Sequence, residues 1–122
     1  MLRQKKHKKR ETTPYKQIKV LYANVQSLKN KIPELGALLD ANEADVACLQ
    51  ESWTLQRDEN ATICPTNYEI VSRVDKNTKS GIGGGVIIMK RQGLTMEEVE
   101  RVDKSYFQAN SCVLTVEGLK ST

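Results

Sequence analysis

Two short apolar segments constrain the fold of this chain more than any other feature of its sequence. Residues 18–23 are rich in β-branched and aromatic side chains and end at Asn24, which predicts a strand. Residues 45–51 contain the nearly continuous apolar run Val-Ala-Cys-Leu. Such a run is typical of a strand that is buried on both faces within a parallel sheet.

Residues 27–42, which lie between these two segments, predict a helix. Its apolar side chains recur at near-helical spacing and belong to Ile32, Leu35, Leu38 and Leu39. Pro33 limits where the regular helix starts, because proline is tolerated only in the first turn. Asn30 is the candidate cap for that later start, with Ser27 in a turn before it. Strand, helix and strand together predict a right-handed βαβ unit and an α/β fold.

Three more strands are predicted beyond this unit. Residues 54–67 are polar and irregular and predict a long loop, after which the alternating residues 68–71 predict a strand. Residues 86–90 follow three glycines and predict a fourth strand, and residues 111–117 alternate and predict a fifth. Residues 96–102 are predicted to form a short helical turn.

The net charge of +4 is concentrated at the N-terminus. Residues 1–10 hold six of the 19 basic side chains and no acidic one, so the rest of the chain carries 13 basic against 15 acidic side chains, a net charge of −2. A globular body that grips a nucleic-acid backbone is therefore not indicated. Residues 1–16 are polar and basic and are predicted to form a disordered tail.

The basic tail has two interpretations. It is a solubilising leader, or it is a binding segment, namely a short nuclear-import signal for an importin or a contact for nucleic acid. The candidate contact residues are Lys5, Lys6, Lys8, Lys9 and Arg10. The only histidine of the chain, His7, lies among them, so a zinc site is not predicted.

The sequence predicts neither secretion nor insertion into a membrane. The longest apolar run, residues 86–89, is far shorter than the roughly 20 residues that a membrane-spanning helix needs. No apolar segment follows the basic N-terminus, so no signal peptide is predicted. Three cysteines without a Cys-x-x-Cys pair indicate reduced thiols. We expect a nuclear or cytoplasmic protein that is not secreted and has no membrane partner.

The predicted βαβ unit places two polar side chains at one edge of the sheet. Asn24 and Glu51 each stand where a predicted parallel strand ends, and ligands of open α/β sheets bind outside these ends. A carboxylate is a hard oxygen ligand for Mg²⁺, which usually takes one or two protein carboxylates together with water and phosphate. An amide orients that carboxylate or donates to a phosphate oxygen. The alternative is a turn asparagine and a solvated glutamate. Trp53, beside the second strand, is interpreted as packing in preference to stacking on a base.

Three ordered motifs resemble those of the endonuclease/exonuclease/phosphatase superfamily, and most closely the apurinic-type endonuclease domain of non-LTR retrotransposons. Residues 20–31 contain Asn-x-x-Ser-Leu followed by lysine, and residues 45–53 contain an aspartate, an apolar strand and Glu-Ser-Trp, with Ser52 in place of the family's usual threonine. Residues 73–75 form a charged turn that leads to the triple glycine at 83–85. The resemblance covers about residues 17–117.

The resemblance implies a Mg²⁺-dependent phosphodiesterase that nicks DNA. Glu51 would bind the metal, and Asn24 would stand beside it and help to hold the phosphate. The implied fold is a DNase I-like two-sheet α/β sandwich, of which residues 17–122 form the N-terminal half.

The family also uses a tyrosine, an Asp-x-Asn motif and a late Ser-Asp-His, none of which is recognisable in this sequence. We therefore expect that the chain alone does not cut DNA and that it is a truncated gene copy or a fragment. An isolated half is also expected to expose the apolar face that packs on the second sheet. Two alternatives remain: a phosphatase of the same superfamily, and a non-catalytic protein that binds nucleic acid or importin through its tail.

Overall fold

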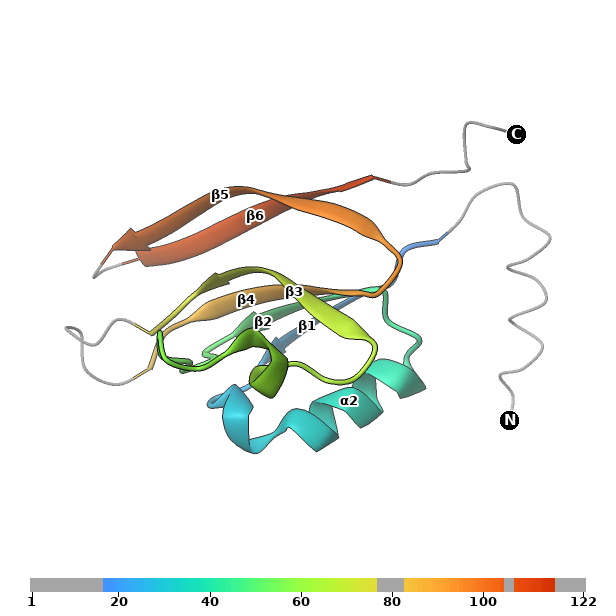
Figure 1. The fold of residues 1–122 in the computed structure, drawn as a ribbon, viewed down its shortest axis with the longest axis horizontal. Helices are drawn as coiled ribbons and strands as arrows, with labels where there is room; N and C mark the ends of the chain where they lie inside the picture. The colour runs from blue at the N-terminus through green and yellow to red at the C-terminus, as the bar shows by residue number, and fades with distance from the viewer. Residues whose placement is uncertain (1–16, 77–82, 105–106, 116–122) are drawn as a thin grey trace.

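The computed structural model describes residues 17–76, 83–104 and 107–115, and these form a mixed α/β structure with two sheets and few helices (Figure 1). Two of the helical elements are short 3₁₀ helices. The elements in chain order are β1 (Val20–Asn24), η1 (Leu28–Asn30), α2 (Ile32–Ala41), β2 (Val46–Gln50), η2 (Asn60–Ile63), β3 (Tyr68–Val74), β4 (Val86–Arg91), β5 (Thr95–Lys104) and β6 (Phe107–Thr115).

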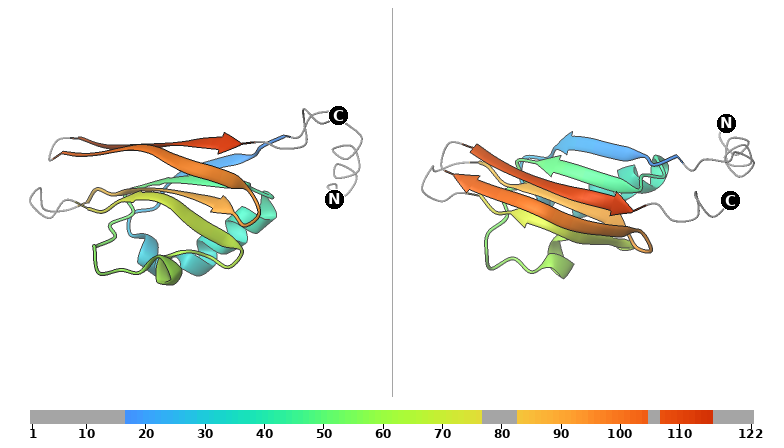
Figure 2. Two further views of the ribbon diagram at one scale, coloured as in Figure 1. Left: turned by 45° about the horizontal axis from the view of Figure 1, so that its top comes forward. Right: turned by 90° about the horizontal axis from the view of Figure 1, so that it is seen from above.

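The larger sheet has four strands in the order β1-β2-β4-β3. β1 and β2 pair in parallel with α2 between them in sequence, which confirms the predicted βαβ unit. β4 pairs antiparallel with both β2 and β3. α2 covers one face of this sheet, and the antiparallel β5–β6 pair lies over the other face (Figures 1 and 2).

The start of the helix follows from Pro33. α2 begins at Ile32 with the proline in its first turn, and the preceding residues form the separate 3₁₀ helix η1. The prediction of Asn30 as the cap is wrong. The N-cap position is Lys31, which makes no side-chain capping bond, while the Asn30 amide donates to Oγ of Ser27 at 3.3 Å.

The core lies between α2 and the four-stranded sheet. Side chains of η1, α2, β2 and β4 interdigitate there, and five of the most deeply buried are Leu28, Leu39, Leu49, Ile87 and Met89. Because side chains alternate along a strand, β1 directs Leu21 and Ala23 towards this core and Tyr22 away from it.

The opposite face of the sheet is covered unevenly. Ser72 of β3 donates its hydroxyl to the Glu98 carboxylate of β5 at 2.6 Å, and the Asn110 amide of β6 reaches the Val86 carbonyl of β4 at 3.5 Å. Over β1, by contrast, Tyr22 is 75% and Val20 is 42% exposed within the described part of the chain. The β5–β6 pair therefore packs on the β3–β4 side of the sheet.

Residues 96–102 do not form the predicted helical turn, since they belong to the ten-residue strand β5. Methionine, glutamate and arginine favour helices, but most of β5 is exposed, so no apolar stripe holds a helix in place. Pairing with β6 along its length decides the outcome. β6 begins at Phe107, earlier than the predicted strand at 111, and residues 116–117 of that prediction lie outside the described residues.

Within the described ranges, no helix combines the length and apolar character that a membrane span requires.

All three cysteines of the chain are free thiols. Burial, with a smaller contribution from the Glu69 carboxylate, raises the pKa of Cys64 to about 11. At pH 8 only about one Cys64 side chain in a thousand is then the reactive thiolate. We expect iodoacetamide to modify Cys64 in the native chain about 100-fold more slowly than in denaturant, as followed by mass spectrometry of its peptide. Equal rates of modification in the native and the denatured chain would contradict a raised pKa for Cys64.

Candidate functional site

The carboxyl ends of β1 and β2 are joined by a continuous set of backbone hydrogen bonds. Asn24 is in register with Gln50, and the chain beyond β1 continues to pair with the chain beyond β2. Ser27 N donates to Glu51 O at 3.0 Å, and Leu28 N donates to Ser52 O at 2.9 Å. The structure therefore brings Asn24 and Glu51 to the same edge of the sheet, where the sequence placed them.

Two donors hold the carboxylate of Glu51. The indole Nε1 of Trp53 donates to Oε1 at 2.8 Å, and the backbone N of Gly84 donates to the same oxygen at 3.1 Å. The Trp53 bond first, and then the Gly84 bond, hold the pKa of Glu51 below its ordinary value, although partial burial opposes them. The carboxylate is thus ionised and oriented at neutral pH.

The segment after β2 has an unusual backbone. Glu51 and Trp53 both have φ of 56°, a region that non-glycine residues rarely adopt. Ser52 lies between them, is fully buried, and its backbone N donates to Gly85 O at 3.2 Å, while Trp53 N donates to Gly84 O at 3.0 Å. Backbone strain of this kind is characteristic of functional sites, where surrounding contacts over-determine it.

The triple glycine forms the other wall of the site. All three glycines have φ between 89° and 98°, and a Cβ on Gly83 would lie 2.8 Å from Oε1 of Glu51. A Cβ on Gly85 would lie 2.4 Å from Oγ of Ser52 and 3.1 Å from N of Trp53. The positive φ favours glycine at all three positions, and at Gly85 a side chain would also be too close to Ser52 and to the Trp53 backbone.

Asn24 stands apart from these contacts. Its side chain is exposed and makes no hydrogen bond with Glu51 or with any other residue that the structure describes. The loop after it is fixed by Lys31, whose Nζ donates to Val25 O at 2.7 Å and to Gln26 O at 2.6 Å. The Asn24 side chain is therefore exposed to solvent at the end of β1, and the Lys31 ammonium is bonded to the loop that follows.

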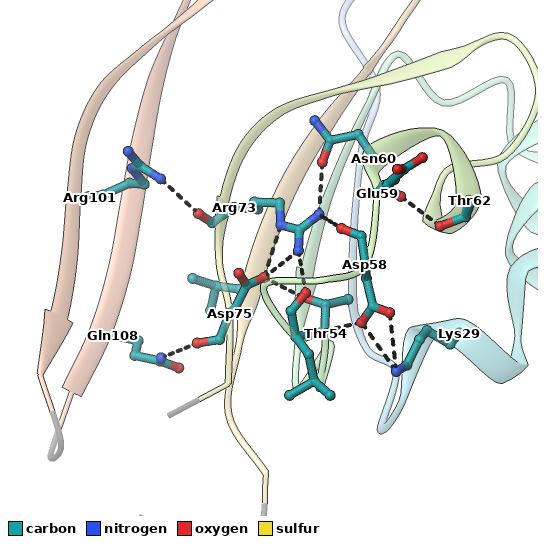
Figure 3. A network of polar contacts seen from close by, with 12 residues as sticks. Lys29, Thr54, Asp58, Glu59, Asn60, Thr62, Arg73, Asp75, Arg101 and Gln108 are labelled. Carbon is teal, nitrogen blue, oxygen red and sulfur yellow. Dashed lines mark hydrogen bonds and ion pairs between the residues drawn. The ribbon is translucent and has the colours of Figure 1, made fainter. Parts of the chain in front are cut away.

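A second network orders the loop that follows Trp53 (Figure 3). The Arg73 guanidinium pairs with Asp75 at 2.8 Å and donates to the carbonyls of Leu55 and Asp58, both at 2.7 Å. Thr54 Oγ1 donates to the same Asp75 oxygen at 2.8 Å. The two charged residues of the third motif thus tie the start of the 54–67 loop to the end of β3. Beside this network lies an open pocket of about 1040 Å³.

Sequence reasoning missed two members of the site. Trp53 was interpreted as packing, whereas its indole N–H is directed at Glu51. Gly84 was placed only in the glycine run before a predicted strand, and its donation to Glu51 was not foreseen. For the bond between Gly84 and Glu51, the only signal in the sequence was the glycine run itself, because these two residues are 33 positions apart.

The carboxylate of Glu51 is the kind of ligand that Mg²⁺ takes from a protein. Mg²⁺ is usually bound by one or two carboxylates together with water and substrate phosphate, and Glu51 offers one ionised carboxylate with one oxygen not hydrogen-bonded by the described residues. No group of three or more histidine, cysteine, aspartate or glutamate side chains that could hold a metal occurs in the described ranges. The residues present therefore fit a site with a single protein carboxylate.

The predicted contact residues of the tail lie outside the described residues. They are Lys5, Lys6, Lys8, Lys9 and Arg10. Of the charged turn that the resemblance assigned to residues 73–75, Arg73 and Val74 belong to the strand β3, and Asp75 follows its end.

Comparison with known proteins gives no family for this chain. No family model matches its sequence, and no curated protein matches it.

Proposed function

We propose that this chain carries the N-terminal part of a Mg²⁺-dependent phosphodiesterase domain with a DNase I-like sandwich fold, and that the substrate of the complete domain is DNA. The observation that carries this proposal is the environment of Glu51. An ionised carboxylate stands at the carboxyl end of a parallel strand pair and is held by an amide of the glycine segment. Three motifs that lie apart in the sequence thereby meet at one place.

Each residue has a defined part in this proposal. Mg²⁺ held by Glu51 would supply stabilisation of negative charge on a scissile phosphate and on its leaving oxygen. Glu51 supplies the carboxylate, already ionised and oriented, so that no reorganisation is required when a cation arrives. Asn24 supplies an exposed amide at the same sheet edge that donates to a phosphate oxygen. Gly84 and Trp53 keep Glu51 in place.

The sequence does not contain the whole catalytic set that the resemblance implies. The chain has one histidine, His7, and it stands in the basic N-terminal segment. An imidazole that positions water or transfers a proton at the Glu51 site is therefore not supplied by residues 17–122. We expect the purified chain to leave supercoiled plasmid intact in Mg²⁺.

A chimera tests the proposal. Residues 17–115 replace the corresponding part of an active retroelement endonuclease, which contributes the Asp-x-Asn and Ser-Asp-His motifs. We expect Mg²⁺-dependent conversion of supercoiled plasmid to nicked circles, and we expect no release of phosphate from inositol phosphates. A folded chimera that releases phosphate but does not nick would favour the phosphatase alternative, and one that does neither would contradict the proposal.

The alternative of a non-catalytic protein that acts through its tail is tested separately. The full chain and a variant without residues 1–10 are compared for binding to DNA and to an importin. If the tail is the functional element, its removal abolishes binding, and if affinity is unchanged that alternative is eliminated.

A further inference from the structure

The two oxygens of the Glu51 carboxylate have different surroundings. Oε1 accepts hydrogen bonds from Trp53 Nε1 at 2.8 Å and from Gly84 N at 3.1 Å, and it lies 2.8 Å from the position of a Cβ on Gly83. Oε2 accepts no hydrogen bond from any other residue in the described part of the chain. One oxygen is therefore committed to the protein and the other is open.

The difference between the two carboxylate oxygens is fixed by the Gly84 backbone and by the Trp53 side chain. Trp53 N donates to Gly84 O at 3.0 Å while Gly84 N donates to Glu51, so the two donors belong to segments that are bonded to each other. The indole lies only two residues from Glu51, and the positive φ of both residues folds the chain so that the ring N–H meets the carboxylate. A rotation that freed Oε1 would break both bonds.

We propose that Trp53 is a positioning residue that decides which divalent cation the Glu51 site accepts, favouring small octahedral cations such as Mg²⁺ and Mn²⁺ over Ca²⁺. This inference rests on the cation site proposed above. Mg²⁺ keeps several waters and needs few protein oxygens, whereas Ca²⁺ takes six to eight oxygens and often both oxygens of one carboxylate. With Oε1 bonded to the indole and to the Gly84 amide, Glu51 offers Ca²⁺ one oxygen in place of two.

The experiment removes the indole N–H alone. Trp53 is the only tryptophan of the chain, so growth of a tryptophan auxotroph on benzothienylalanine replaces this one N–H with sulfur in a ring of nearly the same shape. 5-Fluorotryptophan, which keeps the N–H, is the matched control. Mn²⁺ stands in for Mg²⁺, and the dissociation constants of Mn²⁺ and Ca²⁺ are measured by calorimetry on the whole chain. Trp53→Phe provides a second variant without the N–H.

We expect the preference for Mn²⁺ over Ca²⁺ to fall about 10-fold in the benzothienylalanine chain and in Trp53→Phe, and to stay unchanged with 5-fluorotryptophan. A purely structural role of the ring would alter both affinities together and leave their ratio unchanged, and that result would overturn the inference. Glu51→Gln distinguishes a failure of the proposed cation site from a failure of the proposed role of Trp53. If this substitution leaves Mn²⁺ binding intact, the cation site itself is wrong. If it abolishes binding while the N–H-free variants keep the native ratio, only the role of Trp53 is wrong.

Discussion

In the nicking chimera, Glu51→Gln lowers the rate of Mg²⁺-dependent plasmid nicking by at least about 100-fold. Glutamine keeps the size of the side chain but removes the negative charge that we propose binds the cation. The carboxamide still accepts the Trp53 and Gly84 hydrogen bonds through its oxygen, so the fold of the site is expected to persist. The initial rate of nicked-circle formation, read from agarose gels across a Mg²⁺ series, measures the effect.

Glu69→Gln is the matched control for this substitution. Glu69 is an exposed residue near the start of β3, and its carboxylate forms an ion pair with Lys90 at 2.8 Å. The other end of β3 is the one near the glycines, since Val74 there pairs with Val86. Glu69 is therefore at the end of β3 away from the Glu51 site. The same chemical change there is expected to leave nicking within about twofold of the parent, because an exposed ion pair contributes little. Equal rates for the two glutamine variants and the parent would refute the metal role of Glu51.

Gly85→Ala is expected to lower the free energy of unfolding by roughly 3 kcal/mol or more. Two costs combine at this position. The residue has φ of +98°, which an alanine adopts only with strain, and the new Cβ would lie 2.4 Å from Ser52 Oγ and 3.1 Å from Trp53 N. Relief of the clash requires movement of the buried Ser52 hydroxyl or of the glycine segment away from residues 51–53. Urea unfolding, followed by Trp53 fluorescence, gives the change in stability.

Gly93→Ala separates the two costs, because Gly93 has a similar φ of +101° but nothing within 4 Å of its Cβ position. We expect a loss of about 1–2 kcal/mol there, from backbone strain alone. Ser52→Ala in the Gly85→Ala background is expected to recover part of the loss, since it removes the nearest atom and a buried hydroxyl that has no hydrogen-bond partner. Similar losses for Gly85→Ala and Gly93→Ala would show that close approach of the backbone does not contribute.

The βαβ unit was predictable because each of its elements has a strong local signal. The apolar run of β2 and the helical spacing of residues 32–39 identify elements that are buried, and burial is what the pattern records. β5 gave no such signal. Its ten residues are largely exposed and rich in charge, and they form a strand only because β6 pairs with them along their length. Pairing between two strands is not recorded in the periodicity of either one.

The candidate site, like the fold, was predictable only in part. The ends of two parallel strands meet at one edge, so the placement of Asn24 and Glu51 followed from the order of the elements alone. The hydrogen-bond partners of Glu51 could not be predicted from the order of the elements. The Gly84 amide reaches Glu51 because β4 pairs antiparallel with β2, a relation that joins residues 33 positions apart. The Trp53 bond requires positive φ at two non-glycine residues, which no sequence pattern predicts.

We propose above that the Glu51 carboxylate, held by Trp53 and Gly84, binds a divalent cation. Paramagnetic broadening by Mn²⁺ in ¹H–¹⁵N NMR spectra of the whole chain tests it most directly. The chain has a single indole N–H resonance because it has a single tryptophan, and this N–H lies 2.8 Å (Nε1 to Oε1) from the proposed ligand. We predict that substoichiometric Mn²⁺ broadens the Trp53 indole and Gly84 amide signals first, and that Glu51→Gln abolishes this effect. Broadening that begins elsewhere, or that persists in Glu51→Gln, would contradict the account.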